Sequence, residues 1–189
     1  MAGKFILGTM AAVVAVGVVG VAAGAGGAIR GTNGNDTIIG TAGPDVIVAL
    51  AGDDNVDAEA GNDKVYAGTG NDTVRGGPGD DFVRGGEGND VLEGQDGNDL
   101  IRGRRGDDRV NGGSGNDVLW VGSGADVENG GAGNDRLHAL ASDRQLDVLD
   151  CGDGNDVAVL NSAEHDVTVN CERVIVRPPS AQGDADDNG

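Results

Sequence analysis

Residues 85–93 read GGEGNDVLE, and residues 112–120 read GGSGNDVLW, which is the same nine-residue unit with the same order of residue types. This unit is repeated twelve times without insertion or deletion over residues 31–138. The fourth position is Gly and the sixth is Asp in all twelve units, and the eighth is aliphatic in all except the unit that carries Glu128. A period this strict must determine the fold, because each unit is too small to bury its own apolar residue.

Each unit divides into a turn half and a strand half. Positions one to six are rich in Gly, Asn and Asp, which accept the left-handed backbone angles of tight turns. Positions seven to nine carry β-branched and aliphatic residues, which predicts a three-residue strand with position eight pointing inward. Two units close one flattened coil of 18 residues, so the twelve units of residues 31–138 predict about six coils with two parallel sheets.

The composition of the chain limits the kinds of molecule that it can be expected to bind. The chain has 189 residues with 37 Gly, only 2% aromatic residues and a net charge of −19. This acidity excludes nucleic acid as an expected partner, because an acidic surface repels phosphates. An excess of carboxylates at regular spacing favours cations as binding partners instead.

The stacked coils predict two files of aspartates. Residues 18 apart lie on adjacent coils, one strand spacing or ~4.8 Å apart. One file is Asp36, Asp54, Asp72, Asp90, Asp108 and Asp126, and the other is Asp45, Asp63, Asp81, Asp99, Asp117 and Asp135. These residues could simply cap their own turns. Repulsion between bare carboxylates at this spacing, however, costs about 0.9 kcal/mol per pair in water and about 3.5 at an effective dielectric of 20.

Summed over the ten neighbouring pairs, this repulsion is roughly 9 to 35 kcal/mol, against a typical domain stability of about 5–15 kcal/mol. The coils therefore require neutralisation, either by protons at low pH or by divalent cations at neutral pH. Carboxylates and turn carbonyls are all-oxygen ligands, which favours Ca²⁺ over Mg²⁺. The sequence predicts up to about ten ions, one for each neighbouring pair.

The repeat resembles that of the RTX, or hemolysin-type, calcium-binding proteins, and the resemblance covers residues 31–138 and one further unit at 151–159. It implies an all-β, right-handed parallel β-roll in which each ion lies between turns one coil apart. The ligands it implies are the twelve aspartates above, Asp156, and turn carbonyls. Where Ala49, Ala58 and Ala67 replace the first Gly, and Leu50, Glu59, Gln95 and Arg104 replace the second, we expect some sites to be weak or empty.

The segments outside the array have different compositions. Residues 1–28 read as an export signal, with Lys4, an apolar run and small residues before the array; a retained membrane anchor is the alternative. After signal cleavage we expect no membrane span, and a secreted or surface-attached protein. Residues 139–177 are expected to cap the solenoid with one degenerate repeat, and residues 178–189 to form a disordered polar tail. The inward Glu128 predicts a loosened last coil.

Cys151 and Cys171 are the two cysteines of the chain. In an exported protein such a pair favours a disulfide, which would stabilise the cap by about 3 kcal/mol in the chain-entropy model. Two buried free thiols are the alternative. A zinc site is disfavoured because His138 and His165 have no ligand spacing.

For function, the sequence predicts calcium binding with a structural, adhesive or interaction role and no catalysis, with any protein or glycan partner unknown. One alternative is an enzyme, or an accessory repeat protein of a secreted enzyme, but signal, array, cap and tail leave no segment for a catalytic domain. Another is an ice- or surface-binding solenoid, but the third position of the repeat holds no rank of Thr.

Overall fold

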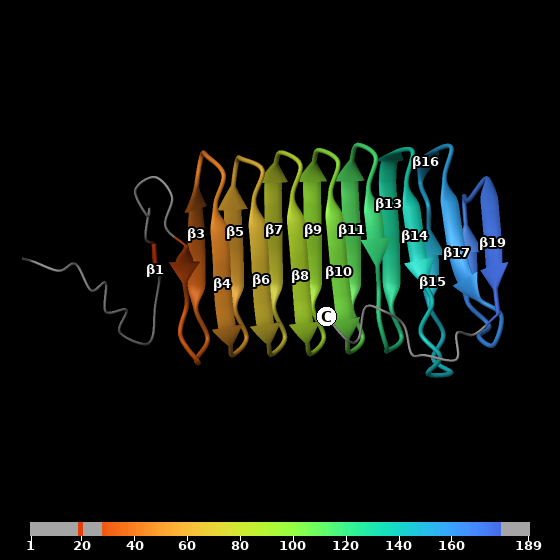
Figure 1. Cartoon of the computed structure of the whole chain (residues 1–189), viewed down its shortest axis with the longest axis horizontal. Coiled ribbons are helices and arrows are strands. Elements are labelled where there is room, and N and C mark those ends of the chain that lie inside the picture. Colours follow the sequence, from red (N-terminus) through yellow and green to blue (C-terminus); the bar gives the residue numbers. More distant parts are fainter. Residues whose placement is uncertain (1–18, 21–27, 179–189) are drawn as a thin grey trace, which may run out of the picture.

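The computed structural model describes residues 19–20 and 28–178, and these form a parallel β-solenoid of about eight turns. The chain winds as a flattened rod whose strands lie across its long axis, with turns along both edges (Figure 1). Alternate strands belong to two sheets, here named sheet A and sheet B. The described residues contain no helix, and therefore no helix long and apolar enough to cross a membrane.

Sheet A contains the odd-numbered strands up to β15, together with β16 and β18. Its strands are β1 (Val19–Gly20), β3 (Thr37–Thr41), β5 (Asn55–Glu59), β7 (Thr73–Pro78), β9 (Val91–Asp96), β11 (Arg109–Ser114), β13 (Val127–Gly133), β15 (Val148–Asp150), β16 (Asp153–Gly154) and β18 (Val167–Val169).

Sheet B contains the even-numbered strands up to β14, followed by β17 and β19. Its strands are β2 (Ile29–Arg30), β4 (Val46–Ala51), β6 (Lys64–Thr69), β8 (Phe82–Glu87), β10 (Leu100–Arg105), β12 (Val118–Trp120), β14 (Arg136–Ala139), β17 (Val157–Asn161) and β19 (Arg173–Arg177).

The register confirms the 18-residue coil. Val65 pairs with Val83, and Ile101 with Leu119, so position eight lies above position eight in successive coils. These side chains are fully buried between the sheets and form a continuous aliphatic core. The expected all-β parallel solenoid is therefore observed.

The strands are longer than the three residues predicted from composition. Most run for five or six residues, through position nine into positions one and two or three of the next unit. Position one faces inward like position eight, and Ala49, Ala58 and Ala67 are completely buried there. The prediction failed because glycines were assigned to turns, whereas here they allow close packing of stacked backbones: a Cβ at Gly86 would overlap the Gly68 carbonyl.

Residues 139–177, the segment expected to cap the solenoid, continue both sheets. Val127 pairs with Val148, 21 residues on, and Val157 pairs with Arg173, 16 residues on. The solenoid therefore has about eight turns, of which the array supplies six. The predicted disulfide is confirmed: Cys151 and Cys171 are bonded, with Cα atoms 5.1 Å apart, and join two successive coils.

Two predictions fall largely outside the described residues. Of the expected signal, residues 1–28, the structure describes a two-residue strand, β1, whose backbone pairs with β3, and residue 28. Of the expected disordered tail, residues 178–189, only Pro178 is described.

Candidate metal centres along the two edges

The sixth-position aspartates lie in two files, as predicted, one at the start of the strands of each sheet. All twelve are buried, with between 1% and 8% of their surface exposed. Position six faces inward because it has the same parity along the strand as positions eight and one. The result is a row of carboxylates inside each edge of the rod.

In ten of the twelve carboxylates, those from Asp54 to Asp135, one oxygen accepts a hydrogen bond from the preceding coil. The backbone N–H of Asp90 donates to Oδ1 of Asp108 at 2.8 Å, and the N–H of Asp99 donates to Oδ1 of Asp117 at 2.8 Å. The same bond recurs along both files. These bonds determine the direction of each carboxylate and leave the second oxygen, Oδ2, available.

In the array, Oδ2 is buried and has no hydrogen-bond partner in ten of the twelve aspartates. These are Asp54, Asp63, Asp72, Asp81, Asp90, Asp99, Asp108, Asp117, Asp126 and Asp135. A buried carboxylate oxygen without a partner is costly, since it has lost its water and gained nothing in return. Ten such atoms in register indicate that a ligand completes them.

The space beside Oδ2 is lined by more oxygen. A methyl group added at Gly94 would overlap both Oδ2 of Asp99 and the carbonyl oxygen of Gly112 in the next coil. The same pair of neighbours, a carboxylate and a carbonyl one coil on, surrounds Gly112, where they are Asp117 and Gly130. Glycine at position one thus keeps open a small space with converging oxygens, which is the donor set that Ca²⁺ takes.

The first coil is different. Oδ2 of Asp36 accepts hydrogen bonds from the backbone N–H of Thr32 at 2.6 Å and from its hydroxyl at 3.0 Å. Thr41 donates to Asp45 in the same way, at 2.6 and 2.9 Å. In these two units a threonine at position two donates hydrogen bonds to the carboxylate oxygen that has no partner in the other ten units. A cation is therefore less needed to compensate the burial of this oxygen.

Burial makes the metal-free files electrostatically unfavourable. Loss of hydration raises the pKa of Asp108 from 3.8 to about 8; the Asp90 N–H opposes the rise, and the charges of Asp90 and Asp126 add to it. Burial likewise raises the pKa of Asp90 and of Asp99 to about 7. A cation beside each carboxylate would reverse this effect by stabilising the ionised form.

The turns keep their shape at the second-position substitutions. Leu50, Glu59, Gln95 and Arg104 have φ angles of 92°, 71°, 84° and 93°, the left-handed conformation that Gly adopts in the neighbouring units. The substitutions are therefore accommodated with backbone strain rather than by a different turn. At position one, Ala49, Ala58 and Ala67 place a methyl group where the other units leave space, so weak sites beside them remain a prediction.

Sequence reasoning named Asp156 as a ligand but missed that both files continue through residues 139–177, with Asp147, Asp166 and Glu172. The N–H of Asp126 donates to Asp147 at 2.9 Å, and that of Asp147 donates to Asp166 at 3.2 Å. In the other file the N–H of Asp135 donates to Asp156 at 2.8 Å, and that of Asp156 donates to Glu172 at 2.8 Å. The sequence does contain an indication of this extension, in the segments DVLD and DVTV. Each keeps the aspartate of position six and the strand residues that follow it, but lacks the glycines of the turn half.

A second ladder was also missed. Position five is Asn or Asp in ten of the twelve units, and its side chain accepts from the backbone two units ahead: the N–H of Asn89 donates to Asn71 at 2.8 Å, and that of Asn98 to Asp80 at 2.8 Å. This exposed ladder runs opposite in direction to the buried one. The two together fix the coil spacing on which the oxygen-lined spaces depend.

Glu128 was expected to loosen the last coil of the array. Its side chain is not displaced to the surface but is fully buried. Neither of its carboxylate oxygens has a hydrogen-bond partner. Burial, with the charges of Asp147 and Asp126, raises its pKa well above 4.5, and the nearby N–H groups of Val121 and His138 oppose the rise without hydrogen-bonding geometry. The preceding strand, β12, has only three residues. The irregular strand of this coil therefore belongs to sheet B, opposite the strand of sheet A that carries Glu128.

The fold and the carboxylate files define a class: a parallel β-roll with all-oxygen cation sites between its coils. The RTX calcium-binding nonapeptide repeat matches the sequence at residues 30–65, 59–92, 66–101, 93–128 and 122–158. The chain belongs to this family, and it is a calcium-binding β-roll. No curated protein matches the sequence.

Proposed function

We propose that the protein is an extracellular β-roll that folds on binding calcium and acts without catalysis, in a structural, adhesive or interaction role. The observation that carries the proposal is the pair of files of buried carboxylates whose second oxygens lack partners in ten units. Up to about ten ions follow, if each such oxygen receives one. When bound, calcium supplies charge neutralisation between the coils.

Folding on binding follows from the position of these charges. In an unfolded chain the carboxylates are hydrated and far apart, whereas the coils bring them together with 1–8% exposure. Binding that requires the folded coils contributes its free energy to folding. Cytosolic calcium is scarce, so the chain would remain unfolded until exported; the disulfide is consistent with an oxidising compartment.

The absence of catalysis is proposed from what the two histidines do. The imidazole of His138 is stacked on Trp120, with ring centroids 3.7 Å apart, and burial lowers its pKa to about 4. His165 lies on the exposed surface. The ordered aspartates are already used by the coil-to-coil ladder.

The test is a calcium titration of the full chain, followed by far-ultraviolet circular dichroism and isothermal calorimetry. We expect little β-signal in excess chelator at pH 7.5 and a cooperative gain with calcium. An unchanged β-signal after complete removal of metal would refute calcium-dependent folding.

Two neighbouring variants locate the effect. Asp108→Asn removes a buried carboxylate with an unpartnered oxygen, while Asp107→Asn changes the exposed neighbour that accepts from the Ala125 N–H. We expect the first to raise the calcium midpoint several-fold and the second to leave it nearly unchanged, since Asn can still accept that bond. Equal midpoints for both variants would remove the sixth position from the metal site.

A further inference from the structure

The outer faces of the two sheets differ sharply in charge. Outward residues on these strands are those at positions seven, nine and two, which alternate with the buried ones. Along the described strands of sheet B none of these is Asp or Glu, and the one acidic residue within those strands is Glu87, at the turn end of β8, in a chain that has 32 acidic residues. Sheet A, by contrast, carries Asp57, Glu59, Glu93 and Asp150 on its outer face.

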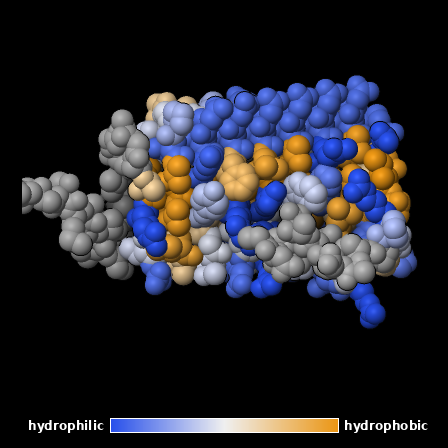
Figure 2. Space-filling view, viewed as in Figure 1, coloured by the Kyte–Doolittle hydropathy of each residue, from blue (hydrophilic) through white to orange (hydrophobic). Residues whose placement is uncertain are grey.

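The outer face of sheet B is instead basic and aromatic. Its outward positions hold eight of the 13 Lys and Arg residues: Arg30, Lys64, Arg84, Arg102, Arg104, Arg136, Arg173 and Arg177. Tyr66, Phe82 and Trp120 also lie there. Apolar patches alternate with hydrophilic side chains along the middle of the rod, below a continuous hydrophilic edge (Figure 2). On a protein of net charge −19, such a face is a local exception that attracts anions.

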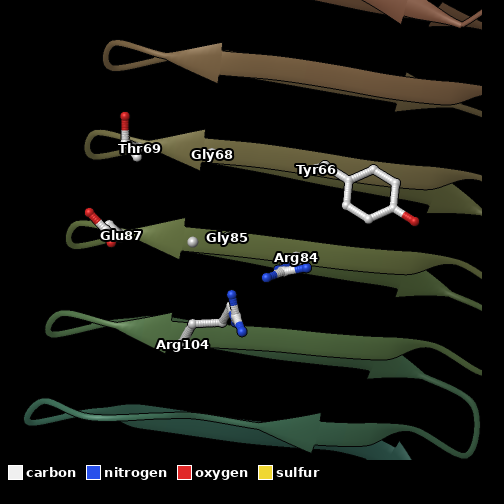
Figure 3. A pocket seen from close by; sticks show the side chains of 8 residues that line it. Tyr66, Gly68, Thr69, Arg84, Gly85, Glu87 and Arg104 are labelled. Carbon is white, nitrogen blue, oxygen red and sulfur yellow. The ribbon is translucent and has the colours of Figure 1, made fainter. Parts of the chain in front are cut away.

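A pocket of about 320 Å³ lies at the centre of this face, across β6, β8 and β10. Its floor is glycine, at residues 68, 85 and 86, where the repeat leaves the sheet without side chains. Its walls are Tyr66 on one strand, Arg84 on the next and Arg104 on the third, with Thr69 and Glu87 at the turn end (Figure 3).

The walls are held by neighbours on the same face. The ring of Tyr66 lies 5.7 Å from that of Phe82, and the guanidinium of Arg102 lies 6.0 Å from the Phe82 ring centre. Glu87 forms a solvent-exposed ion pair with Arg105 at 3.2 Å, at the rim of the pocket. The volume is at the lower end of the range of small-ligand sites, about 300–1,000 Å³.

The lining groups select among anions. Two guanidinium groups suit a planar carboxylate, which they can bind with paired hydrogen bonds. A flat aromatic wall suits the C–H face of a ring, which a small inorganic ion lacks. Thr69 and the carboxylate of Glu87 can bond to hydroxyl groups. A hydroxylated ring that carries a carboxylate satisfies all four groups.

We propose that this pocket, the Tyr66–Arg104 pocket, binds an acidic sugar, a uronic acid unit of a glycan. Its ring stacks on Tyr66, its carboxylate lies between Arg84 and Arg104, and its hydroxyls meet Thr69 and Glu87. The pocket spans three strands at ~4.8 Å spacing, so a glycan chain would run along the rod. The site needs folded coils and in that respect rests on the proposed function, to which it adds a partner class.

The test is calorimetry of the calcium-loaded full chain with a trigalacturonate probe at fixed free calcium. We expect saturable binding of trigalacturonate that weakens as salt is raised, and none of the neutral maltotriose. Arg84→Gln and Arg104→Gln should each weaken binding about tenfold, the loss expected for one charge-assisted contact. Arg109→Gln, on the outer face of sheet A, is the matched control and should bind like the parent.

Each contrary outcome is informative. Three outcomes would overturn the proposal: equal affinity for maltotriose, equal affinity of the Arg109 and Arg84 variants, or no binding of trigalacturonate. Tighter binding of an acidic peptide than of the sugar would also overturn it, and would assign the face to a protein partner. Circular dichroism in calcium shows whether each variant is folded. The two proposals fail separately: a chain that keeps its β-signal in chelator refutes calcium-dependent folding and leaves the sugar binding measurable.

Discussion

The middle coils and the C-terminal coils both stack buried carboxylates, but they differ in the regularity of their spacing. In the middle, the spacing is a constant 18 residues, and glycine at position one, from Gly76 to Gly112, keeps a space open beside the buried Oδ2 of its unit. In residues 139–177 the spacing drifts to 21, 19 and 16, the glycines are mostly lost, and a disulfide joins the last coils. From this comparison we infer that regular spacing is needed where cations bridge the coils, and can be relaxed where a disulfide joins them.

The largest effect should come from pH in the absence of metal. The folded-state pKa values of Asp108 and Asp147 are raised to about 8, and that of Asp126 to about 7, in each case mainly by burial, from 3.8. A raised folded pKa stabilises the fold below the unfolded pKa, and this contribution is lost as pH rises through the folded value. In chelator, we therefore expect β-signal near pH 4 that disappears between about pH 6 and 8.

Circular dichroism in chelator, from pH 4 to 8, measures this transition, and the calcium-loaded protein is the control that should stay folded at pH 8. A chelated protein with the same spectrum at both ends of the range would contradict the role given to the buried carboxylates.

The disulfide should have the next largest effect. Replacing Cys151 and Cys171 together by Ser should lower the free energy of unfolding in calcium by about 3 kcal/mol, because a closed loop of 20 residues is released. Urea unfolding of the calcium-loaded variant measures the loss. Reduction of the parent protein should reproduce it, and an unchanged stability would show that the C-terminal coils are held as firmly by other contacts.

Glu128 lies where the two regions meet, and Glu128→Leu should stabilise the calcium-loaded protein. A buried carboxyl without hydrogen bonds is replaced by an aliphatic side chain like those of Val110 and Leu119, a gain of about 2 kcal/mol. Thermal unfolding measures it, with Glu93→Leu, on the outer face, as control. Destabilisation would mean instead that the Glu128 carboxylate holds a ligand.

The smallest effect concerns strain within the middle coils. Gln95 has a φ of 84°, and Gln95→Gly should raise the free energy of unfolding by about 1 kcal/mol by relieving it. Gln95→Ala keeps the Cβ and should bring no such gain. If both variants behave alike in urea unfolding, the left-handed conformation at this position is not strained.

The sequence predicted most of the regular region, because a strict period leaves few alternatives: the register, the buried files and the aliphatic core follow from positions six and eight. The strand bounds were missed, since Gly86 was assigned to a turn although the stacked backbone excludes a Cβ there. Asp147 and Asp166 were missed because their spacing departs from 18. Thr32 was not recognised as a partner of Asp36, since that bond depends on a local side-chain conformation rather than on the repeat.

The two opposed ladders at positions five and six have a further consequence. Within residues 31–138, every bond of these ladders joins a residue to its equivalent 18 residues away, such as Asp90 to Asp108 and Asn71 to Asn89, and none spans more than one coil. Duplicating or deleting a pair of units would leave every remaining bond with an equivalent partner. The length of the rod can therefore change during evolution by unequal recombination, without any redesign of its interior.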